Sequence, residues 1–115
     1  MNHESAPALV SLAAAKLLPE IDARESKTLF RHGTMEVRWW TPRMPDDQMP
    51  HRRDEIYFVA EGSGVFNRAG AKHPCRPGDV LFVAAGVPHS FEDCTADFGV
   101  WVLFWGPPGG ETSER

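Results

Sequence analysis

The sequence predicts an all-β fold, a barrel or sandwich of short antiparallel strands in a single domain. Ten glycines and ten prolines in 115 residues are more than a helical bundle of this size would carry, and they suit many strands joined by turns. Short apolar segments recur at intervals of roughly 8 to 12 residues, which is typical of β-sandwiches and barrels. Together they predict about eight or nine strands.

The first predicted element is a short helix near the N-terminus. Ser5 or Ser11 could cap it, and it should end near Leu18 because Pro19 disfavours helical geometry in the residue before it. The apolar run 8–18 has the length of a signal sequence. However, no Lys or Arg precedes it and a lysine interrupts it, so we interpret it as a helix.

The predicted strands begin after this helix. Residues 28–40 contain two strand-like pieces separated by Gly33, and a Pro-rich connector follows at 41–50. Further strands, bounded by Gly, Pro or Asp, are predicted at 55–62, 64–67, 73–76, 79–86, 89–93 and 98–105. We therefore divide the chain into an N-terminal segment (1–27), a barrel domain (28–107) and a flexible C-terminal tail (108–115).

The composition predicts a soluble, cytoplasmic protein. Hydrophobic residues make up 42% and charged residues 24%, as in ordinary globular chains. A net charge of -4 argues against nucleic acid as a partner, and no run reaches the roughly 18 apolar residues of a membrane span. Cys75 and Cys94 lack metal-site spacing, and without a secretory signature we expect both thiols to be reduced.

His51 and Glu55 flank a charged tripeptide, and two interpretations compete: a charged surface turn or half of a metal site. On one straight strand, four steps of about 3.3 Å would separate the two side chains by about 13 Å. Sharing an ion therefore needs residues 52–54 to turn tightly, with His51 and Glu55 on adjacent strands. Glu55 and Tyr57 would then share the inward face, where an unpaired carboxylate needs a cation.

His89 begins a later predicted strand after a turn. It lies two residues before Phe91, so the imidazole and the phenyl ring point to the same face. By itself this pattern fits a hydrogen-bonded structural histidine at least as well as a ligand.

The two segments together resemble the two motifs of the cupin superfamily. For the first motif, G-x5-H-x-H-x3,4-E-x6-G, this chain supplies His51, Glu55 and Gly62. For the second motif, G-x5-P-x-G-x2-H-x3-N, it supplies Gly78, Gly86 and His89. The resemblance spans roughly residues 35–105 and implies a double-stranded β-helix, or jelly-roll, barrel.

Four motif positions differ here: the first histidine, the opening glycine, the proline and the final asparagine fall on Met49, Arg43, Ala84 and Asp93. Met49 matters most, because a thioether is a soft ligand and a poor replacement in an O/N site. Gln48 is a candidate replacement. Strict alternation would point it away from His51, but Pro50 could mark a bulge that reorients it.

The resemblance implies a site for a divalent transition metal ion, such as Fe, Mn, Ni or Zn. Its ligands would be His51, Glu55 and His89, with Gln48 as a candidate fourth, which resembles the two-histidine, one-carboxylate triad of Fe(II) oxygenases. It further implies a small-molecule substrate and an oxygenase- or isomerase-type reaction, with Glu55 and Tyr57 as candidate catalytic residues. A non-enzymatic ligand-binding or regulatory cupin, with or without metal, is the alternative.

A second copy of the chain is the expected protein partner. Segments 79–85 and 98–105 are apolar on both faces, and the face outside the barrel needs cover from the N-terminal helix or another subunit. We therefore expect a homodimer. Arg52 and Arg53 could bind an anionic substrate at the barrel mouth, but we interpret them as a solvated surface.

Overall fold

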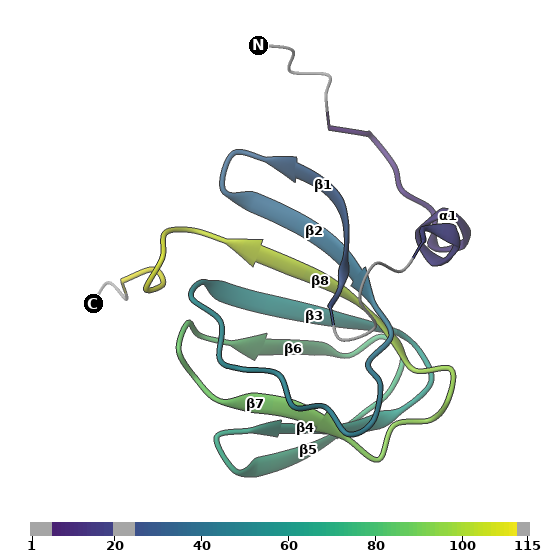
Figure 1. Cartoon of the computed structure of the whole chain (residues 1–115), viewed down its shortest axis with the longest axis vertical. Coiled ribbons are helices and arrows are strands. Elements are labelled where there is room, and N and C mark those ends of the chain that lie inside the picture. The colour runs from purple at the N-terminus through teal and green to yellow at the C-terminus, as the bar shows by residue number, and fades with distance from the viewer. Residues whose placement is uncertain (1–5, 20–24, 113–115) are drawn as a thin grey trace.

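Eight antiparallel strands make up nearly all of the fold (Figure 1). The computed structural model describes residues 6–19 and 25–112. Within these residues the strands are β1 (Lys27–His32), β2 (Met35–Trp40), β3 (Asp54–Glu61), β4 (Gly64–Arg68), β5 (Ala71–Cys75), β6 (Val80–Val83), β7 (His89–Glu92) and β8 (Gly99–Trp105). The all-β prediction is confirmed, and each predicted strand segment corresponds to one of the eight.

The strands form two sheets that share one core. The larger sheet has the order β1-β2-β8-β3-β6 and the smaller one the order β5-β4-β7. Inward-facing side chains of both sheets make up a single cluster: Trp40, Tyr57, Val59, Phe66, Cys75, Val83, Phe91, Phe98, Val100 and Val102. This is the predicted jelly-roll arrangement, in which two antiparallel sheets pack their apolar faces together.

β3 shows how the sequence pattern places polar groups inside the barrel. Glu55, Tyr57 and Val59 are 2%, 0% and 3% exposed, whereas Phe58 between them is 41% exposed. Period-two alternation therefore holds, and the predicted inward face of this strand is confirmed. Because β3 lies between β8 and β6, Glu55 is paired with Phe104 on one side and Val83 on the other.

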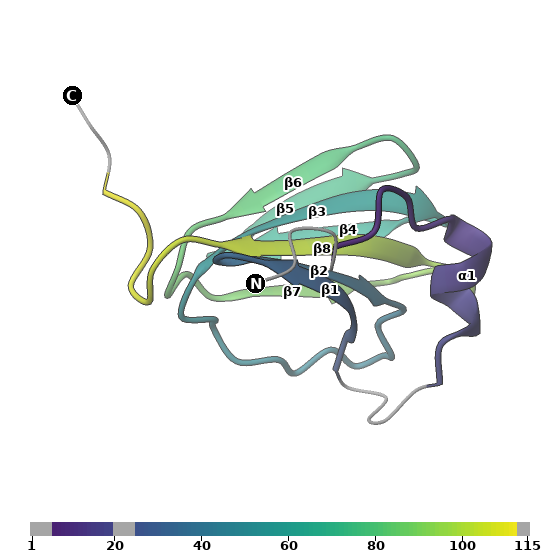
Figure 2. The ribbon, with the colours of Figure 1, turned by 90° about the horizontal axis from the view of Figure 1, so that it is seen from above.

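Helix α1 (Leu12–Leu17) lies at one end of the sheets, and the C-terminal segment lies at the other end (Figure 2). Ser11 is its N-cap and accepts a hydrogen bond from the Ala14 amide at 3.1 Å, while the alternative, Ser5, lies outside the described residues. Lys27 Nζ donates to the Leu18 carbonyl at 2.6 Å and so satisfies the helix end. Within residues 6–19 and 25–112, no helix has the length and apolar character needed to cross a membrane.

Gly62, the closing glycine of the first motif, occupies a position that other residues would not fit. Its φ is +69°, and a Cβ there would lie 2.5 Å from Thr95 Oγ1 and 2.7 Å from Phe98 Cα. Both the left-handed backbone and the close approach of the neighbouring loop therefore require glycine. This turn lets β3 pass directly into β4 and so links the two sheets.

The connector between β2 and β3, residues 41–53, is irregular and crosses the front of the molecule in Figure 1. Several hydrogen bonds fix it to the barrel, and two of them lie at or just before β7. Asp46 Oδ2 accepts from the Phe91 amide of β7 at 2.8 Å, and the Gly86 amide donates to the His51 carbonyl at 2.8 Å. The connector therefore brings residues 46–51 against β7, the strand that begins with His89.

Asp54 differs from the sequence prediction, which placed it in a turn. It is the first residue of β3, and only 6% of it is exposed. Its carboxylate accepts from the Ala85 amide at 2.9 Å and from the Glu111 amide at 2.9 Å, and the Gly109 amide donates to the Arg52 carbonyl at 2.7 Å. Asp54 thus joins β3 to the 84–88 turn and to the C-terminal segment.

Candidate metal centre

His89 is the first residue of β7, and its ring is held in one orientation. Its Nδ1 lies 2.9 Å from the Val87 carbonyl oxygen. Because a carbonyl only accepts, Nδ1 carries the proton and the Nε2 lone pair points inward. That Nε2 lies 3.3 Å from Glu55 Oε1 and 3.1 Å from the Tyr57 hydroxyl. Fixing one ring nitrogen on a carbonyl is how proteins prepare the other for a metal ion.

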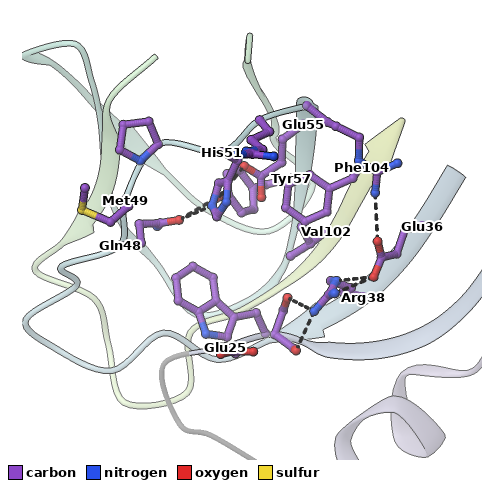
Figure 3. A pocket seen from close by; sticks show the side chains of 15 residues that line it. Glu25, Glu36, Arg38, Gln48, Met49, His51, Glu55, Tyr57, Val102 and Phe104 are labelled. Atoms are coloured by element: carbon purple, nitrogen blue, oxygen red, sulfur yellow. Dashed lines mark hydrogen bonds and ion pairs between the residues drawn. The ribbon is translucent and has the colours of Figure 1, made fainter. Parts of the chain in front are cut away.

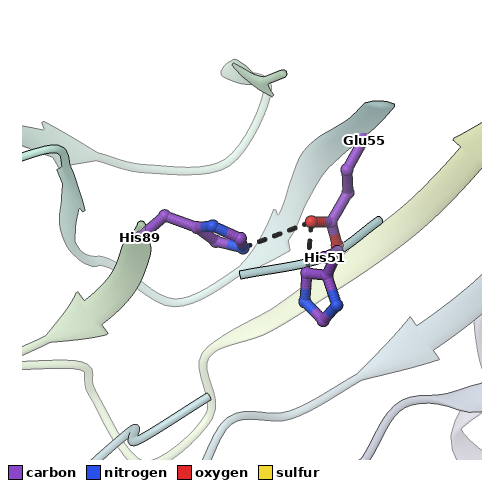
Figure 4. Close-up of side chains that lie close together, drawn as sticks. All are labelled: His51, Glu55 and His89. Carbon is purple, nitrogen blue, oxygen red and sulfur yellow. Dashed lines mark ion pairs between the residues drawn. The ribbon is translucent and has the colours of Figure 1, made fainter. Parts of the chain in front are cut away.

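Glu55 is the buried acid at the centre of the cluster. Its Oε1 is buried and accepts no hydrogen bond from the described residues. Two imidazole nitrogens face it, His89 Nε2 at 3.3 Å and His51 Nε2 at 3.8 Å (Figure 4). A carboxylate oxygen without a hydrogen bond inside a barrel is costly unless a cation lies beside it.

His51 approaches Glu55 from the connector. The backbone bends at residues 52–53, as the metal-site interpretation required. His51 itself is not on an adjacent strand as predicted, because it lies in the irregular segment before β3. Its side chain is 35% exposed and its ring centre lies 5.1 Å from that of His89.

The three residues fit a single ion. One ligand atom from each of His51, Glu55 and His89 can be chosen so that all lie within 4.8 Å of one another. Two ligands bound at about 2.1 Å lie about 3.0 Å apart in an octahedron and about 3.4 Å apart in a tetrahedron. The separations of 3.3 and 3.8 Å from Glu55 Oε1 are near these values.

Gln48 also lies at this centre. Its Oε1 is 2.9 Å from His51 Nε2 and 3.5 Å from the Tyr57 hydroxyl. Strand alternation does not apply, because residues 47–50 are not in a strand, so no bulge is needed to orient Gln48. Figure 3 shows Gln48 pointing toward His51 and Met49 pointing away from it, and Met49 is 75% exposed.

Burial and charge give the two imidazoles different proton affinities. Burial lowers the pKa of His51, and the attraction of Glu55 does not fully offset it. Burial also lowers the pKa of His89, but the contacts with Glu55 and the Val87 carbonyl outweigh it, so the pKa of His89 is raised. Burial and the Glu55 carboxylate raise the pKa of Tyr57 well above its usual value. Tyr57 therefore stays protonated and can donate at neutral pH.

A pocket of about 470 Å³ adjoins the cluster. Val102 and Phe104 give it apolar lining, and Trp40 and Tyr57 give it aromatic lining. Its wall also carries an ion-pair network that the sequence did not reveal, centred on Glu36. A pocket of this size and mixed lining suits a small molecule.

The network around Glu36 corrects the interpretation of Arg53 as solvated. Arg53 Nη2 lies 2.9 Å from Glu36 Oε1, and its side chain is only 24% exposed. Arg38 Nε donates to Glu36 Oε2 at 2.8 Å, and Arg31 joins the same oxygen at 3.0 Å. Arg38 and Arg53 also lie over the Phe104 ring, 6.0 and 5.7 Å from its centre. Only alternation with Met35, Val37 and Trp39 hinted that Glu36 and Arg38 share a face.

Residues 42–105, more than half of the chain, match a family model described as cupin domain. An uncharacterised protein of Streptomyces coelicolor is 38% identical over 63 residues, which are 55% of this chain and 59% of that protein. The oxalate-binding protein of Thermotoga maritima is 44% identical over 39 residues, 34% of this chain and 32% of its own length. The alignments thus span about three-fifths and one-third of these two relatives.

Solved structures agree with the fold. A cupin 2 conserved barrel domain protein from Salinispora arenicola superimposes with a TM-score of 0.63 at 18% sequence identity, covering 88% of this chain and 90% of that chain. At such a low sequence identity, the similarity supports the barrel fold and says nothing about function. The chain carries two motifs in register, folds into the jelly-roll barrel that they predicted, and matches the family model over residues 42–105. It therefore belongs to the cupin domain family.

Proposed function

We propose that this cupin binds a divalent transition metal ion through His51, Glu55 and His89, with Gln48 as a fourth ligand, and acts on a small molecule in the adjoining pocket. The observation that carries the proposal is the buried Glu55 Oε1, which accepts no hydrogen bond from residues 6–19 or 25–112 and faces two imidazole nitrogens. Two histidines and one carboxylate suit Fe, Mn, Ni or Zn, and the amide oxygen of Gln48 is compatible with the same ions.

Residues of the chain would bind and orient the substrate for an oxygenase- or isomerase-type reaction. When bound, the ion would act as a Lewis acid on an oxygen atom of the substrate. The protonated Tyr57 hydroxyl can donate a hydrogen bond beside it, and Glu55 is the nearest carboxylate for a proton transfer. Val102 and Phe104 line the pocket with apolar surface, which would limit the access of water to the bound substrate.

Metal content tests the proposal directly. Protein from cells grown with each metal in excess should contain about one ion per chain by elemental analysis. His51→Ala and His89→Ala should lose it, whereas His32→Ala, which removes a histidine from an exposed position at the end of β1, should keep it. Metal-free protein after growth in every metal, or equal content in all variants, would overturn the proposal.

A non-enzymatic role is the second candidate, and the name of the Thermotoga relative, an oxalate-binding protein, supports it. Turnover separates the two functions. The enzyme proposal predicts product formation or oxygen consumption in a substrate screen with Fe(II), and loss of both in Glu55→Ala. A ligand that raises the melting temperature of the metal-loaded protein but is never converted would favour the binder.

We further propose that two copies pair through the outer face of the larger sheet. Phe58, Val80 and Phe82 are 41%, 58% and 45% exposed there, and they lie next to one another because Phe58 pairs with Val80 and Ile56 with Phe82. Contiguous apolar surface of this kind marks interaction sites. A dimer by light scattering that dissociates in Phe58→Ser/Phe82→Ser supports this proposal, and a monomeric wild type contradicts it. The cytoplasmic location and the domain boundaries stay predictions.

A further inference from the structure

The carboxylate of Asp46 controls which atom of the Gln48 amide faces the metal centre. Asp46 Oδ2 accepts a hydrogen bond from Gln48 Nε2 at 2.7 Å, and Asp46 Oδ1 accepts from the Gln48 backbone amide at 3.2 Å. The same Oδ2 accepts from the Phe91 amide of β7 at 2.8 Å. Asp46 is thereby fixed to the strand that carries His89, and it holds both nitrogens of Gln48.

A side-chain amide has one donor end and one acceptor end, so holding one end decides the direction of the other. Because the carboxylate accepts from Nε2, Oε1 must point away from Asp46, toward His51 and Tyr57. Oε1 can only accept, so the 2.9 Å contact uses a proton on His51 Nε2. An ion that takes the place of this proton would meet Nε2 and Oε1 together.

We propose that Asp46 is a positioning residue that presents Gln48 Oε1 as an oxygen ligand, replacing the histidine that the motif would place at Met49. The inference rests on the proposed metal site and adds the residue that completes it. The 2.9 Å between Gln48 Oε1 and His51 Nε2 is close to the roughly 3.0 Å expected between neighbouring ligands of one octahedral ion. Without Asp46, the amide could turn its NH₂ group toward the ion, and an NH₂ group is no ligand.

The matched perturbations are Asp46→Ala and Asp46→Asn. Asp46→Ala removes the oxygen that accepts from Gln48 Nε2, so the amide can rotate and Oε1 can turn away from His51. Asp46→Asn can keep its oxygen in the place of Oδ2, which accepts from both Gln48 Nε2 and the Phe91 amide, so it should still hold Gln48. Loss of a partner that orients a ligand typically costs 10- to 100-fold in metal affinity. We therefore expect Asp46→Ala to bind metal about 10- to 100-fold more weakly, close to Gln48→Ala, and Asp46→Asn to lose less.

The experiment is a titration of metal-free protein with Co²⁺. Calorimetry measures the affinity, and the visible absorption spectrum of the bound ion reports its coordination. The variants are Asp46→Ala, Gln48→Ala and their combination. Asp46→Asn and Asp47→Asn, the latter at the exposed neighbouring position, are controls that each remove one negative charge. Asp46→Ala and Gln48→Ala should weaken binding and alter the Co²⁺ spectrum alike, and the double variant should be no weaker than Gln48→Ala. Thermal unfolding of the metal-free variants checks that each is folded.

The conservative variant Asp46→Asn separates the effect of the lost hydrogen bond from the effect of the lost charge. Asp46→Asn loses the charge of Asp46 but can keep the acceptor for Gln48 Nε2, so its affinity should lie above that of Asp46→Ala. Unchanged affinity and spectrum in Asp46→Ala and Gln48→Ala, together with lost binding in His51→Ala and His89→Ala, would overturn the inference and leave the metal site standing. Absence of Co²⁺ binding in the wild type would overturn both.

Discussion

Replacing Asp54 should destabilise the barrel more than its position beside a surface bend suggests. Asp54 is 6% exposed and satisfies two backbone amides, those of Ala85 and Glu111. A hydrogen bond to a charged group contributes about 1.5–3 kcal/mol, so Asp54→Ala should cost about 3–6 kcal/mol. Domains of this size have a total stability of about 5–15 kcal/mol, so the change removes a large fraction of it.

Chemical unfolding of metal-free protein, followed by tryptophan fluorescence, measures this cost. Asp54→Asn keeps one acceptor and should lose about half as much. Asp79→Ala is the matched control. The Asp79 carboxylate accepts from the Arg76 amide at 2.9 Å in an exposed position, where water competes for the hydrogen bond, so its loss should cost about 0.5–1.5 kcal/mol. If Asp54→Ala lost no more stability than Asp79→Ala, the role assigned to the buried carboxylate would be wrong.

Three further predictions follow from the same contacts. Burial alone would raise the pKa of Glu36, but Arg38, Arg31 and Arg53 bring it below the usual 4.5. The ionised carboxylate therefore stabilises the folded protein above pH 4.5, and this stabilisation is lost as the pH falls through the lower pKa of the folded state. Wild type should therefore lose more stability than Glu36→Gln as the pH is lowered from 7 through the acidic range in urea unfolding, whereas parallel curves would contradict the ion-pair network. Gly99→Ala places a Cβ 2.5 Å from a Trp39 ring carbon and should cost about 1–3 kcal/mol by overpacking, while Gly70→Ala, with open space but a φ of +92°, should show only backbone strain. Metal at 100 times its dissociation constant should stabilise the wild type by about 2.7 kcal/mol, a chelator should reverse this, and His89→Ala should respond to neither.

The sequence was sufficient to predict the strands, because the alternation of polar and apolar side chains and the turn residues between strands are local features. It predicted all eight segments of the barrel and the inward face of Glu55 and Tyr57. It also indicated that the chain must turn within residues 52–54 if His51 and Glu55 are to meet, and the bend lies at 52–53. Each of these features depends on the order of side chains along one strand or through one turn.

The parts that the sequence did not reveal depend on contacts between distant segments. Asp46 lies 45 residues from Phe91, and Asp54 lies 57 residues from Glu111, and both seemed to be loop or turn residues. The position of Gln48 was ambiguous because alternation assumes a strand, whereas the connector is irregular. Its orientation follows from the Asp46 contact, which no local pattern indicates.

The most direct test of the proposed metal centre is a crystal structure of protein loaded with Mn²⁺, with anomalous diffraction recorded to locate the ion. The proposal predicts one strong peak within about 2.0–2.3 Å of Glu55, His51 and His89, with Gln48 Oε1 turned toward it. A barrel with no anomalous peak at Glu55 after Mn²⁺ loading, or with the ion held by other residues, would contradict the proposal.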